Sequence, residues 1–151
     1  MPLTDPSIIQ AASKIKLFAF DVDGVMTDGS LYIGNSGEEF KCFNVLDGQG
    51  IKFLTQCSIA TAIITKRRSQ LLQVRAQELG IVNLYQGCED KLTTLKQLAD
   101  KLEINLGQVA YLGDDLPDLP VITQVGLGLT VPGGHKTVKQ YATASTVAGG
   151  G

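Results

Sequence analysis

The stretch DVDGVMTD (residues 21–28) begins where the apolar run IKLFAF (residues 15–20) ends. A short continuous apolar run is typical of a buried β-strand. In an open α/β sheet, ligands bind at the carboxyl ends of the strands, so we expect Asp21 and Asp23 to face a crevice there. Two nearby carboxylates repel each other unless a proton or a cation lies between them, and Mg²⁺ is a natural cation for such oxygen ligands.

A second acidic cluster, GDDLPD (residues 113–118), follows the apolar run VAYL (residues 109–112) in the same way. If the two strands are neighbours in the sheet, Asp114 lies close to Asp21 and completes a metal site. The competing interpretation is that these aspartates cap helices and fill turns. Two such clusters, each directly after an apolar strand, favour the metal site.

The rest of the chain alternates between strand-like and helix-like segments. The turn residues GNSG (34–37), between residues 30–33 and 38–44, predict a β-hairpin. Further strands are expected at residues 60–64, 84–85, 109–112, 125–130 and 142–146, and helices at residues 48–57, 69–79, 91–102 and near 117–123, with a helical turn inside residues 1–13. This alternation indicates an α/β fold, a Rossmann-like parallel sheet with helices on both faces. No repeat or linker divides the chain, so we expect a single domain over residues 1–151.

Composition narrows the class of protein. The 151 residues carry a net charge of -2 without a basic stripe, so nucleic acid is not favoured as a partner. The three cysteines stand at unrelated spacings, which favours reduced thiols in a cytosolic protein over disulfides or zinc. We find no signal peptide and no apolar stretch near the ~20 residues that span a bilayer, so no membrane partner is expected.

Five further side chains are candidates for binding a phosphate or another anion. Thr65 follows the second buried strand, where it either donates to a phosphate oxygen or caps a helix. Lys91 opens a helix, where it either neutralises a phosphoryl group or is simply solvated. Arg67, Arg68 and Arg75 form a small basic set that either holds an anionic substrate or belongs to a solvent-facing surface.

The order Asp21-x-Asp23-Gly24, Thr65, Lys91, Gly113-Asp114-Asp115 resembles the four motifs of the haloacid dehalogenase-like superfamily. Three longer stretches, residues 21–54, 84–91 and 109–121, resemble the 3-deoxy-D-manno-octulosonate 8-phosphate phosphatase family. These are small members in which a β-hairpin insert stands in place of a large cap domain. The resemblance covers nearly all of the chain.

The resemblance implies a role for each motif residue. Asp21 is the nucleophile and Asp23 the general acid and base, while Thr65 and Lys91 bind the transferring phosphoryl group. Mg²⁺ is held by Asp21, Asp114 and the backbone carbonyl of Asp23. The positions that match substrate contacts are Asp23, Asn44, Val45, Leu46, Asp47, Gly48, Lys52, Arg67, Arg75 and Lys91.

The implied reaction is hydrolysis of 3-deoxy-D-manno-octulosonate 8-phosphate to the sugar acid and phosphate through an aspartyl-phosphate, a step in making a lipopolysaccharide precursor in the bacterial cytoplasm. The resemblance also implies a homotetramer in which hairpins associate and a neighbouring subunit's tail helps to close the site. Two departures stand out. Lys66 replaces a family glycine, and the chain stops at the glycine run 149–151, after which we expect a flexible or missing tail.

Three alternatives stay open. The substrate is instead a nine-carbon, sialic-type sugar-acid phosphate, or the chain is a catalytically weak assembly module. A signalling receiver domain shares the clustered aspartates, the threonine and the lysine. Receivers place the accepting aspartate after a middle strand, whereas Asp47 stands between the hairpin and a helix here.

Overall fold

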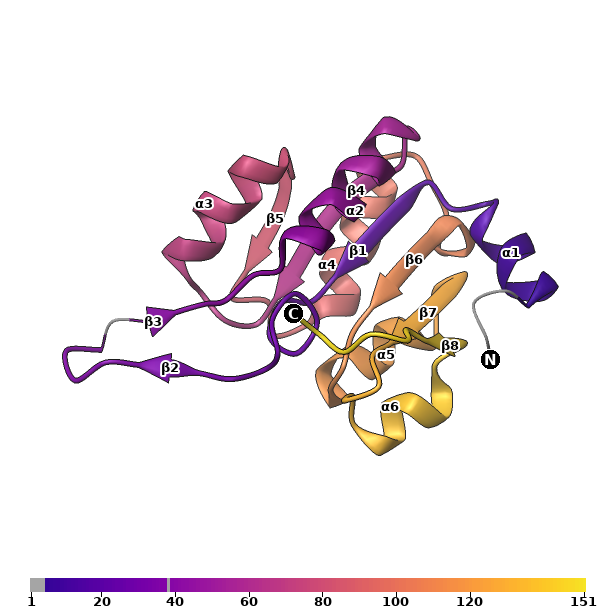
Figure 1. Cartoon of the computed structure of the whole chain (residues 1–151). Helices are drawn as coiled ribbons and strands as arrows, with labels where there is room; N and C mark the ends of the chain where they lie inside the picture. Colours follow the sequence, from indigo (N-terminus) through magenta and orange to yellow (C-terminus); the bar gives the residue numbers. More distant parts are fainter. Residues whose placement is uncertain (1–4, 38) are drawn as a thin grey trace.

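A parallel sheet forms the centre of the molecule (Figure 1). Within residues 5–37 and 39–151, which this computed structural model describes, the sheet has six strands in the order β5-β4-β1-β6-β7-β8. Every neighbouring pair in it is parallel. The strands are β1 (Leu17–Phe20), β4 (Ala60–Thr65), β5 (Asn83–Gln86), β6 (Val109–Leu112), β7 (Leu127–Thr130) and β8 (Ala144–Ser145).

The strand order reverses at β1, which lies between β4 and β6. Phe20 is level with Ile63 on one side and with Leu112 on the other. The backbone N–H of Asp21 continues the pairing by donating to the carbonyl oxygen of Leu112 at 3.0 Å. The residues after β1, β4 and β6 therefore emerge side by side at a topological switch point, where ligands bind in such sheets.

Helices cover both faces of the sheet, as predicted (Figure 1). On one face lie α1 (Pro6–Ala12), α2 (Val45–Gln56) and α3 (Gln70–Leu79), and on the other α4 (Lys91–Lys101), α5 (Leu119–Ile122) and α6 (Lys136–Tyr141). A short 3₁₀ helix, Leu106–Gln108, precedes β6, and another, Leu116–Asp118, precedes α5. Each face of the sheet has its own apolar layer. On the face covered by α4 and α6 the layer includes Leu95, Leu98 and Val138, and on the face covered by α2 and α3 it includes Ile51, Leu72 and Ala76. No helix among these is long and apolar enough to cross a membrane.

Capping residues explain where the helices begin and end. α3 ends at Gly80, which is left-handed at φ 72°, as the glycine predicts. α2 begins at Val45 rather than at the expected residue 48, because the side chain of Asn44 accepts from the N–H of Leu46 at 2.8 Å. α6 was not predicted; His135 caps it by accepting from the N–H of Thr137.

The predicted hairpin is present as a separate antiparallel ribbon that extends from the body (Figure 1). Its strands are β2 (Tyr32–Ile33) and β3 (Glu39–Phe40), both shorter than the expected 30–33 and 38–44. Residue 38 and the first four residues of the expected leader lie outside the described part of the chain. Four apolar side chains of the hairpin are exposed: Leu31, Tyr32, Ile33 and Phe40.

The end of the chain lies against the turn after β1. The N–H of Gly151 donates to the carbonyl oxygen of Val25 at 3.2 Å. A Cβ added to Gly150 would lie only 2.0 Å from the carbonyl oxygen of Gly24. The glycine run is therefore packed against this turn, since only residues without side chains can approach it so closely.

Candidate active site

A cavity of about 290 Å³ opens at the switch point of the sheet. It brings together six of the residues singled out in the sequence: Asp21, Asp23, Thr65, Arg67, Lys91 and Asp114. They come from the ends of β1, β4 and β6 and from the start of α4. Parallel strands deliver these side chains to one edge, although the chain between the first and the last of them is long.

Lys91 is the centre of the buried charges. Its side chain is 2% exposed, and its Nζ lies 2.7 Å from Oδ2 of Asp21 and 2.6 Å from Oδ1 of Asp118. Burial opposes the charge on Lys91, but the two carboxylates outweigh it and raise the pKa of the ammonium group above its ordinary value. Lys91 is therefore a fixed cation beside Asp21 rather than the solvated residue of the competing interpretation.

Asp118 fixes the position of Lys91. Its Oδ1 accepts from Lys91 and from the hydroxyl of Tyr111 at 2.7 Å, and its Oδ2 accepts from the N–H groups of Asp114 and Asp115 at 3.1 and 3.2 Å. The carboxylate is fully buried, yet every one of these partners is a donor. Asp118 is not among the residues predicted to act in the site; the sequence signal for it is its place in the GDDLPD cluster, four residues after Asp114.

The two carboxylate oxygens of Asp21 differ in their contacts. Oδ2 is bound to Lys91, whereas Oδ1 is buried without a hydrogen-bond partner among the described residues. Burial raises the pKa of the Asp21 carboxyl, and the Lys91 charge only partly offsets this. A buried carboxylate oxygen without a partner fits either a nucleophile or a metal ligand.

The acidic cluster fits a divalent cation. Asp21, Asp114 and Asp118 each offer a carboxylate oxygen, and these atoms lie within 4.8 Å of one another. Oδ1 of Asp114 is also buried without a partner among the described residues. Burial, together with the charges of Asp118 and Asp21, raises the pKa of Asp114 to about 7. Hard oxygen ligands with uncompensated negative charge are what Mg²⁺ prefers. The side chain of Asp23, by contrast, is not in this cluster.

Gly24 brings the two acidic clusters together. Its φ is +85°, a conformation that L-residues with side chains rarely adopt. A Cβ at this position would lie 2.1 Å from Oδ2 of Asp114. The glycine therefore permits both the turn after Asp23 and the close approach of Asp114.

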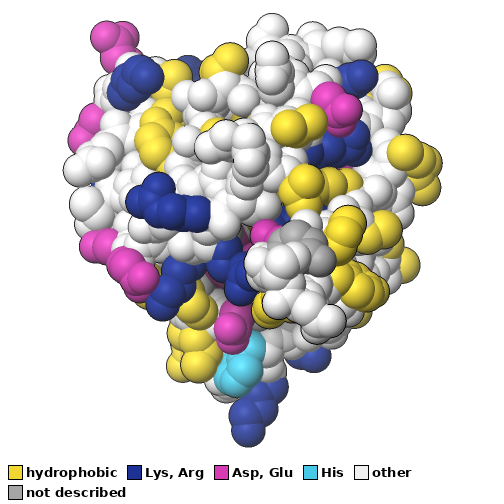
Figure 2. All heavy atoms as spheres, turned by 90° about the vertical axis from the view of Figure 1, so that its left-hand side faces the viewer, with side chains coloured by type: hydrophobic (Ala, Val, Ile, Leu, Met, Phe, Trp, Pro, Cys, Tyr) yellow, Lys and Arg dark blue, Asp and Glu magenta, His cyan; other side chains and the backbone are white. Residues whose placement is uncertain are grey.

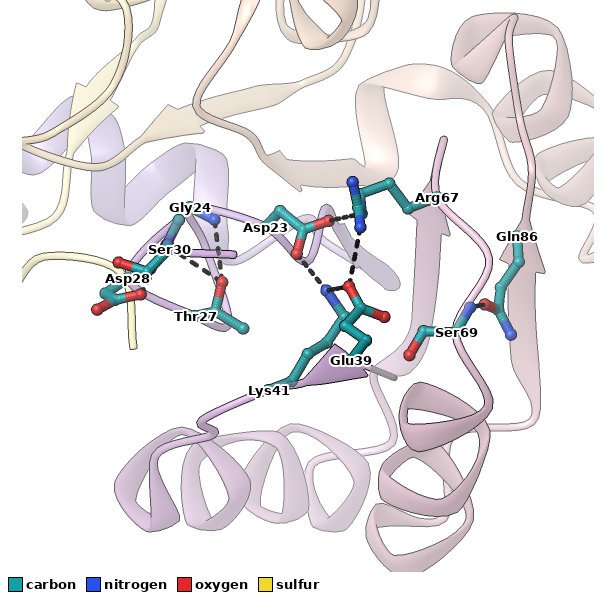
Figure 3. Close-up of polar contacts among 11 residues, drawn as sticks. Asp23, Gly24, Thr27, Asp28, Ser30, Glu39, Lys41, Arg67, Ser69 and Gln86 are labelled. Carbon is teal, nitrogen blue, oxygen red and sulfur yellow. Dashed lines mark hydrogen bonds and ion pairs between the residues drawn. The ribbon is translucent and has the colours of Figure 1, made fainter. Parts of the chain in front are cut away.

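Asp23 lies at the rim of the cavity, and its carboxylate points toward the hairpin (Figure 3). Its Oδ1 accepts from Nζ of Lys41 at 2.5 Å, and its Oδ2 lies 3.5 Å from Nε of Arg67. Oε1 of Glu39 lies 3.2 Å from the same Lys41 nitrogen and 2.9 Å from Arg67. The predicted Asp23 and Arg67 therefore meet two residues, Glu39 and Lys41, that sequence analysis did not identify.

Thr65 ends β4 and Lys66 follows it directly, and both line the cavity. Thr65 is almost fully buried, which fits a short hydroxyl donor toward a bound group. Lys66, in place of the family glycine, pairs at its exposed end with Glu89 at 3.0 Å. The non-glycine residues with positive φ in the described chain are Ser58 and Glu103, so Lys66 adopts an ordinary backbone conformation.

The other residues expected to bind substrate do not line this cavity. Asn44 and Val45 line a second hollow, beside Asp28 and Gly151. Gly48, Lys52 and Arg75 line a third, of about 200 Å³. Leu46 and Asp47 face an apolar one of about 230 Å³.

Arg75 is held away from the cavity at Asp21. Its guanidinium donates to the carbonyl oxygen of Asn44 at 3.2 Å and stacks over the ring of Phe43 at 5.8 Å. Within one chain, therefore, the structure does not bring these substrate-contact candidates to Asp21.

Positive side chains surround the acidic site. Figure 2 shows Lys and Arg side chains gathered about the acidic ones near the middle of the face that carries the hairpin. Lys66, Arg67 and Lys91 line the cavity itself. Cations at these positions attract an anionic ligand to a site that also contains several carboxylates.

Comparison with known proteins agrees with the geometry. The family model for haloacid dehalogenase-like hydrolases matches residues 36–148. The chain is 52% identical over 134 residues to 3-deoxy-D-manno-octulosonate 8-phosphate phosphatase KdsC of Yersinia pestis, covering 89% of this chain and 71% of the relative. It is 45% identical over 144 residues to the same phosphatase of Escherichia coli (strain K12), covering 95% and 77%.

Solved structures give the same result. The crystal structure of 3-deoxy-D-manno-octulosonate 8-phosphate phosphatase from Yersinia pestis superposes with a TM-score of 0.94 at 49% identity, covering 96% of this chain and 78% of that one. The phosphatase from Moraxella catarrhalis, in complex with a magnesium ion, a phosphate ion and a KDO molecule, superposes with a TM-score of 0.92 at 46% identity, covering 94% and 82%.

Proposed function

The chain belongs to the haloacid dehalogenase-like hydrolase family, and from that premise we propose that it is a Mg²⁺-dependent phosphatase that hydrolyses 3-deoxy-D-manno-octulosonate 8-phosphate. The cavity at Asp21 carries this proposal. It joins a buried carboxylate with a free oxygen, a fixed cation at Lys91 and a carboxylate cluster suited to a metal ion. The identity of 45% to 52% with phosphatases of this name supports the substrate.

Asp21 acts as the nucleophile in the first half of the reaction. One of its carboxylate oxygens attacks phosphorus, and the bond from phosphorus to the sugar oxygen breaks. Asp23 gives its proton to the departing oxygen, so the sugar leaves as an alcohol. Lys91 and Thr65 hold the phosphoryl oxygens, and Asp118 keeps Lys91 in place.

Asp23 acts as the base in the second half. It takes a proton from a water molecule as the water oxygen bonds to phosphorus, and the bond from phosphorus to Asp21 breaks. Asp21 and Asp114 would hold the Mg²⁺ ion, with the backbone carbonyl of Asp23 as a further ligand. When bound, the ion offsets negative charge on the phosphoryl oxygens.

The working unit is a homotetramer in this proposal. Two observations support association through the hairpin: Ile33 and Phe40 are 64% and 63% exposed on it, and the substrate-contact candidates around Asn44 and Arg75 do not reach the Asp21 cavity within one chain. A neighbouring subunit completes the site. We place the enzyme in the bacterial cytoplasm, in the synthesis of a lipopolysaccharide precursor.

Phosphate release from a panel of sugar-acid phosphates tests this function. The panel contains eight-carbon and nine-carbon members, assayed with Mg²⁺, with EDTA and with the Asp21→Asn variant. We expect the highest kcat/KM on 3-deoxy-D-manno-octulosonate 8-phosphate and a loss of roughly 10³-fold or more in Asp21→Asn. Asp100→Asn, an exposed change on α4, is the matched control and keeps full activity.

Each of the other possible outcomes contradicts a different part of the proposed function: the substrate, the mechanism or the activity itself. Faster turnover of a nine-carbon substrate shows that the substrate is wrong and leaves the mechanism standing. Turnover that resists both EDTA and Asp21→Asn shows that the mechanism is wrong. A chain that releases no phosphate from any compound is an assembly module rather than an enzyme.

A further inference from the structure

Lys41 is a buried cation that the reaction described above does not use. It follows β3, at the base of the hairpin, and its side chain is 3% exposed. Its Nζ lies within ion-pair distance of both Asp23 and Glu39 (Figure 3). A buried ammonium group is costly unless it is paired, so this side chain stays where its carboxylate partners are.

Lys41 and Arg67, the two cations that contact Asp23, differ in how exposed their side chains are. Lys41 is enclosed and lies at 2.5 Å from Oδ1, whereas the Arg67 side chain is 43% exposed and lies at 3.5 Å from Oδ2. Arg67 also donates to Glu39 at 2.9 Å, so its predicted role requires it to exchange these contacts for an anionic substrate, and its exposure leaves room for that movement. Lys41 then remains as the constant partner of Asp23.

Glu39 joins the two cations to the hairpin. It binds Lys41 and Arg67 through the same oxygen, Oε1, and its pKa is lowered because hydrogen bonds from Arg67 and Lys41 outweigh the effect of burial. Glu39 balances part of the charge of Lys41 and Arg67. Together with Asp23, these residues form a cluster of two carboxylates and two cations. The hairpin and Asp23 are thus connected by ion pairs, not only by the backbone.

We propose that Lys41 is a positioning residue that holds Asp23 for proton transfer and leaves Oδ2 as the oxygen that carries the exchanged proton. This inference rests on the proposed role of Asp23 as general acid and base. In the first step the proton passes from Oδ2 to the departing oxygen as its bond to phosphorus breaks and the bond from Asp21 forms. Lys41 keeps its own protons and only fixes the direction of the carboxyl group.

The test uses aryl phosphates whose leaving phenols differ in acidity, from phenyl phosphate to p-nitrophenyl phosphate. The value of kcat/KM reports the steps up to departure of the phenol, and nitrophenolate departs without needing a proton. In Lys41→Met we expect kcat/KM to fall by roughly tenfold or more for phenyl phosphate and by less than about threefold for p-nitrophenyl phosphate. Lys101→Met, an exposed change on α4, leaves both values unchanged.

An equal loss on all aryl phosphates overturns the proposal, because a purely structural role or a contact with the phosphoryl group would slow every substrate alike. No loss on any of them overturns it as well. If Lys41→Met does not fold, Lys41→Gln carries the same comparison with a smaller, polar side chain. None of these substrates contains a sugar, so a wrong sugar in the proposed function does not affect the result.

Discussion

Single residues determine whether the two acidic clusters meet. Gly24 is the clearest case, because its backbone conformation and its contact with Asp114 each require the absence of a side chain. Gly80 has a similar φ of +72°, but a Cβ there would have no atom within 4 Å. Comparing Gly24 with Gly80 therefore separates the energetic cost of a left-handed backbone from the cost of a steric clash between a Cβ and Asp114.

Gly24→Ala should therefore affect both stability and catalysis. The left-handed conformation alone costs about 1–2 kcal/mol for a residue with a side chain, and displacement of Asp114 adds a loss of metal affinity. Gly80→Ala should show only the first effect. Denaturant unfolding measures the stability of both variants, and phosphate release per folded molecule measures activity. Full activity in Gly24→Ala would contradict the role given to the contact with Asp114.

The site residues also show which functional side chains can be predicted from the sequence. Asp21, Asp23, Thr65, Lys91 and Asp114 were predicted from their motif positions, and they line one cavity. Asp118 lay within a quoted motif but had no role, because its partners are set by the fold.

Lys41 gave no signal at all. Nothing nearby in sequence reveals that the hairpin folds its base back onto Asp23, and an isolated lysine is usually solvated.

Elements were predicted well where pattern and capping agreed. β4, β6 and α3 match their expected ranges to within a residue, because apolar runs and Gly80 mark their ends. α2 was expected three residues late, since Asn44 was treated as hairpin rather than cap. The short α6 was missed, because a glycine-rich segment hides a helix that begins at an unusual cap, His135.

The hairpin carries the prediction that belongs to this scale. Replacing Ile33 and Phe40 together by Asp should convert the proposed tetramer to monomers, because it places charges in the proposed apolar contact. Light scattering coupled to size exclusion measures the mass. Val82→Asp, at a side chain that is 88% exposed on another part of the molecule, should leave the mass unchanged.

Activity adds a second measurement on the same variant. The dissociated form should lose kcat/KM for the sugar-acid phosphate far more than for p-nitrophenyl phosphate, since in the proposed tetramer only the larger substrate reaches the neighbouring subunit. A monomeric wild-type chain would refute the tetramer.

The whole molecule should respond to pH and Mg²⁺ together through Asp114. Its pKa rises from 3.8 to about 7 on folding, so the folded chain binds this proton more tightly than the unfolded chain does. The stability that this proton provides is complete below pH ~4 and is lost as pH rises toward 7. Metal-free protein should therefore become less stable over this range.

Mg²⁺ should have the opposite dependence, because it binds the deprotonated carboxylate. At pH 8, a concentration of about a hundred times Kd should stabilise the fold by about 2.7 kcal/mol. At pH 5 the affinity should be roughly a hundredfold weaker, leaving about 0.4 kcal/mol at the same concentration. Thermal unfolding with and without Mg²⁺ measures both trends. Asp114→Asn should reduce the difference between the two pH values, and the raised pKa of Asp21 accounts for what remains. A Mg²⁺ effect that is independent of pH would count against Asp114 as a ligand.

The position of β1 in the sheet has a consequence for how the protein is made. Its two neighbours, β4 and β6, come later in the chain, and Leu112 is the partner that completes the pairing of Phe20. On the ribosome, at ordinary rates of synthesis, β1 must wait roughly 5 to 20 seconds before β6 has been made. Throughout that time the backbone N–H and C=O groups on the β6 side of β1 are unpaired, which makes the nascent chain a natural client for chaperones that shield unpaired strands.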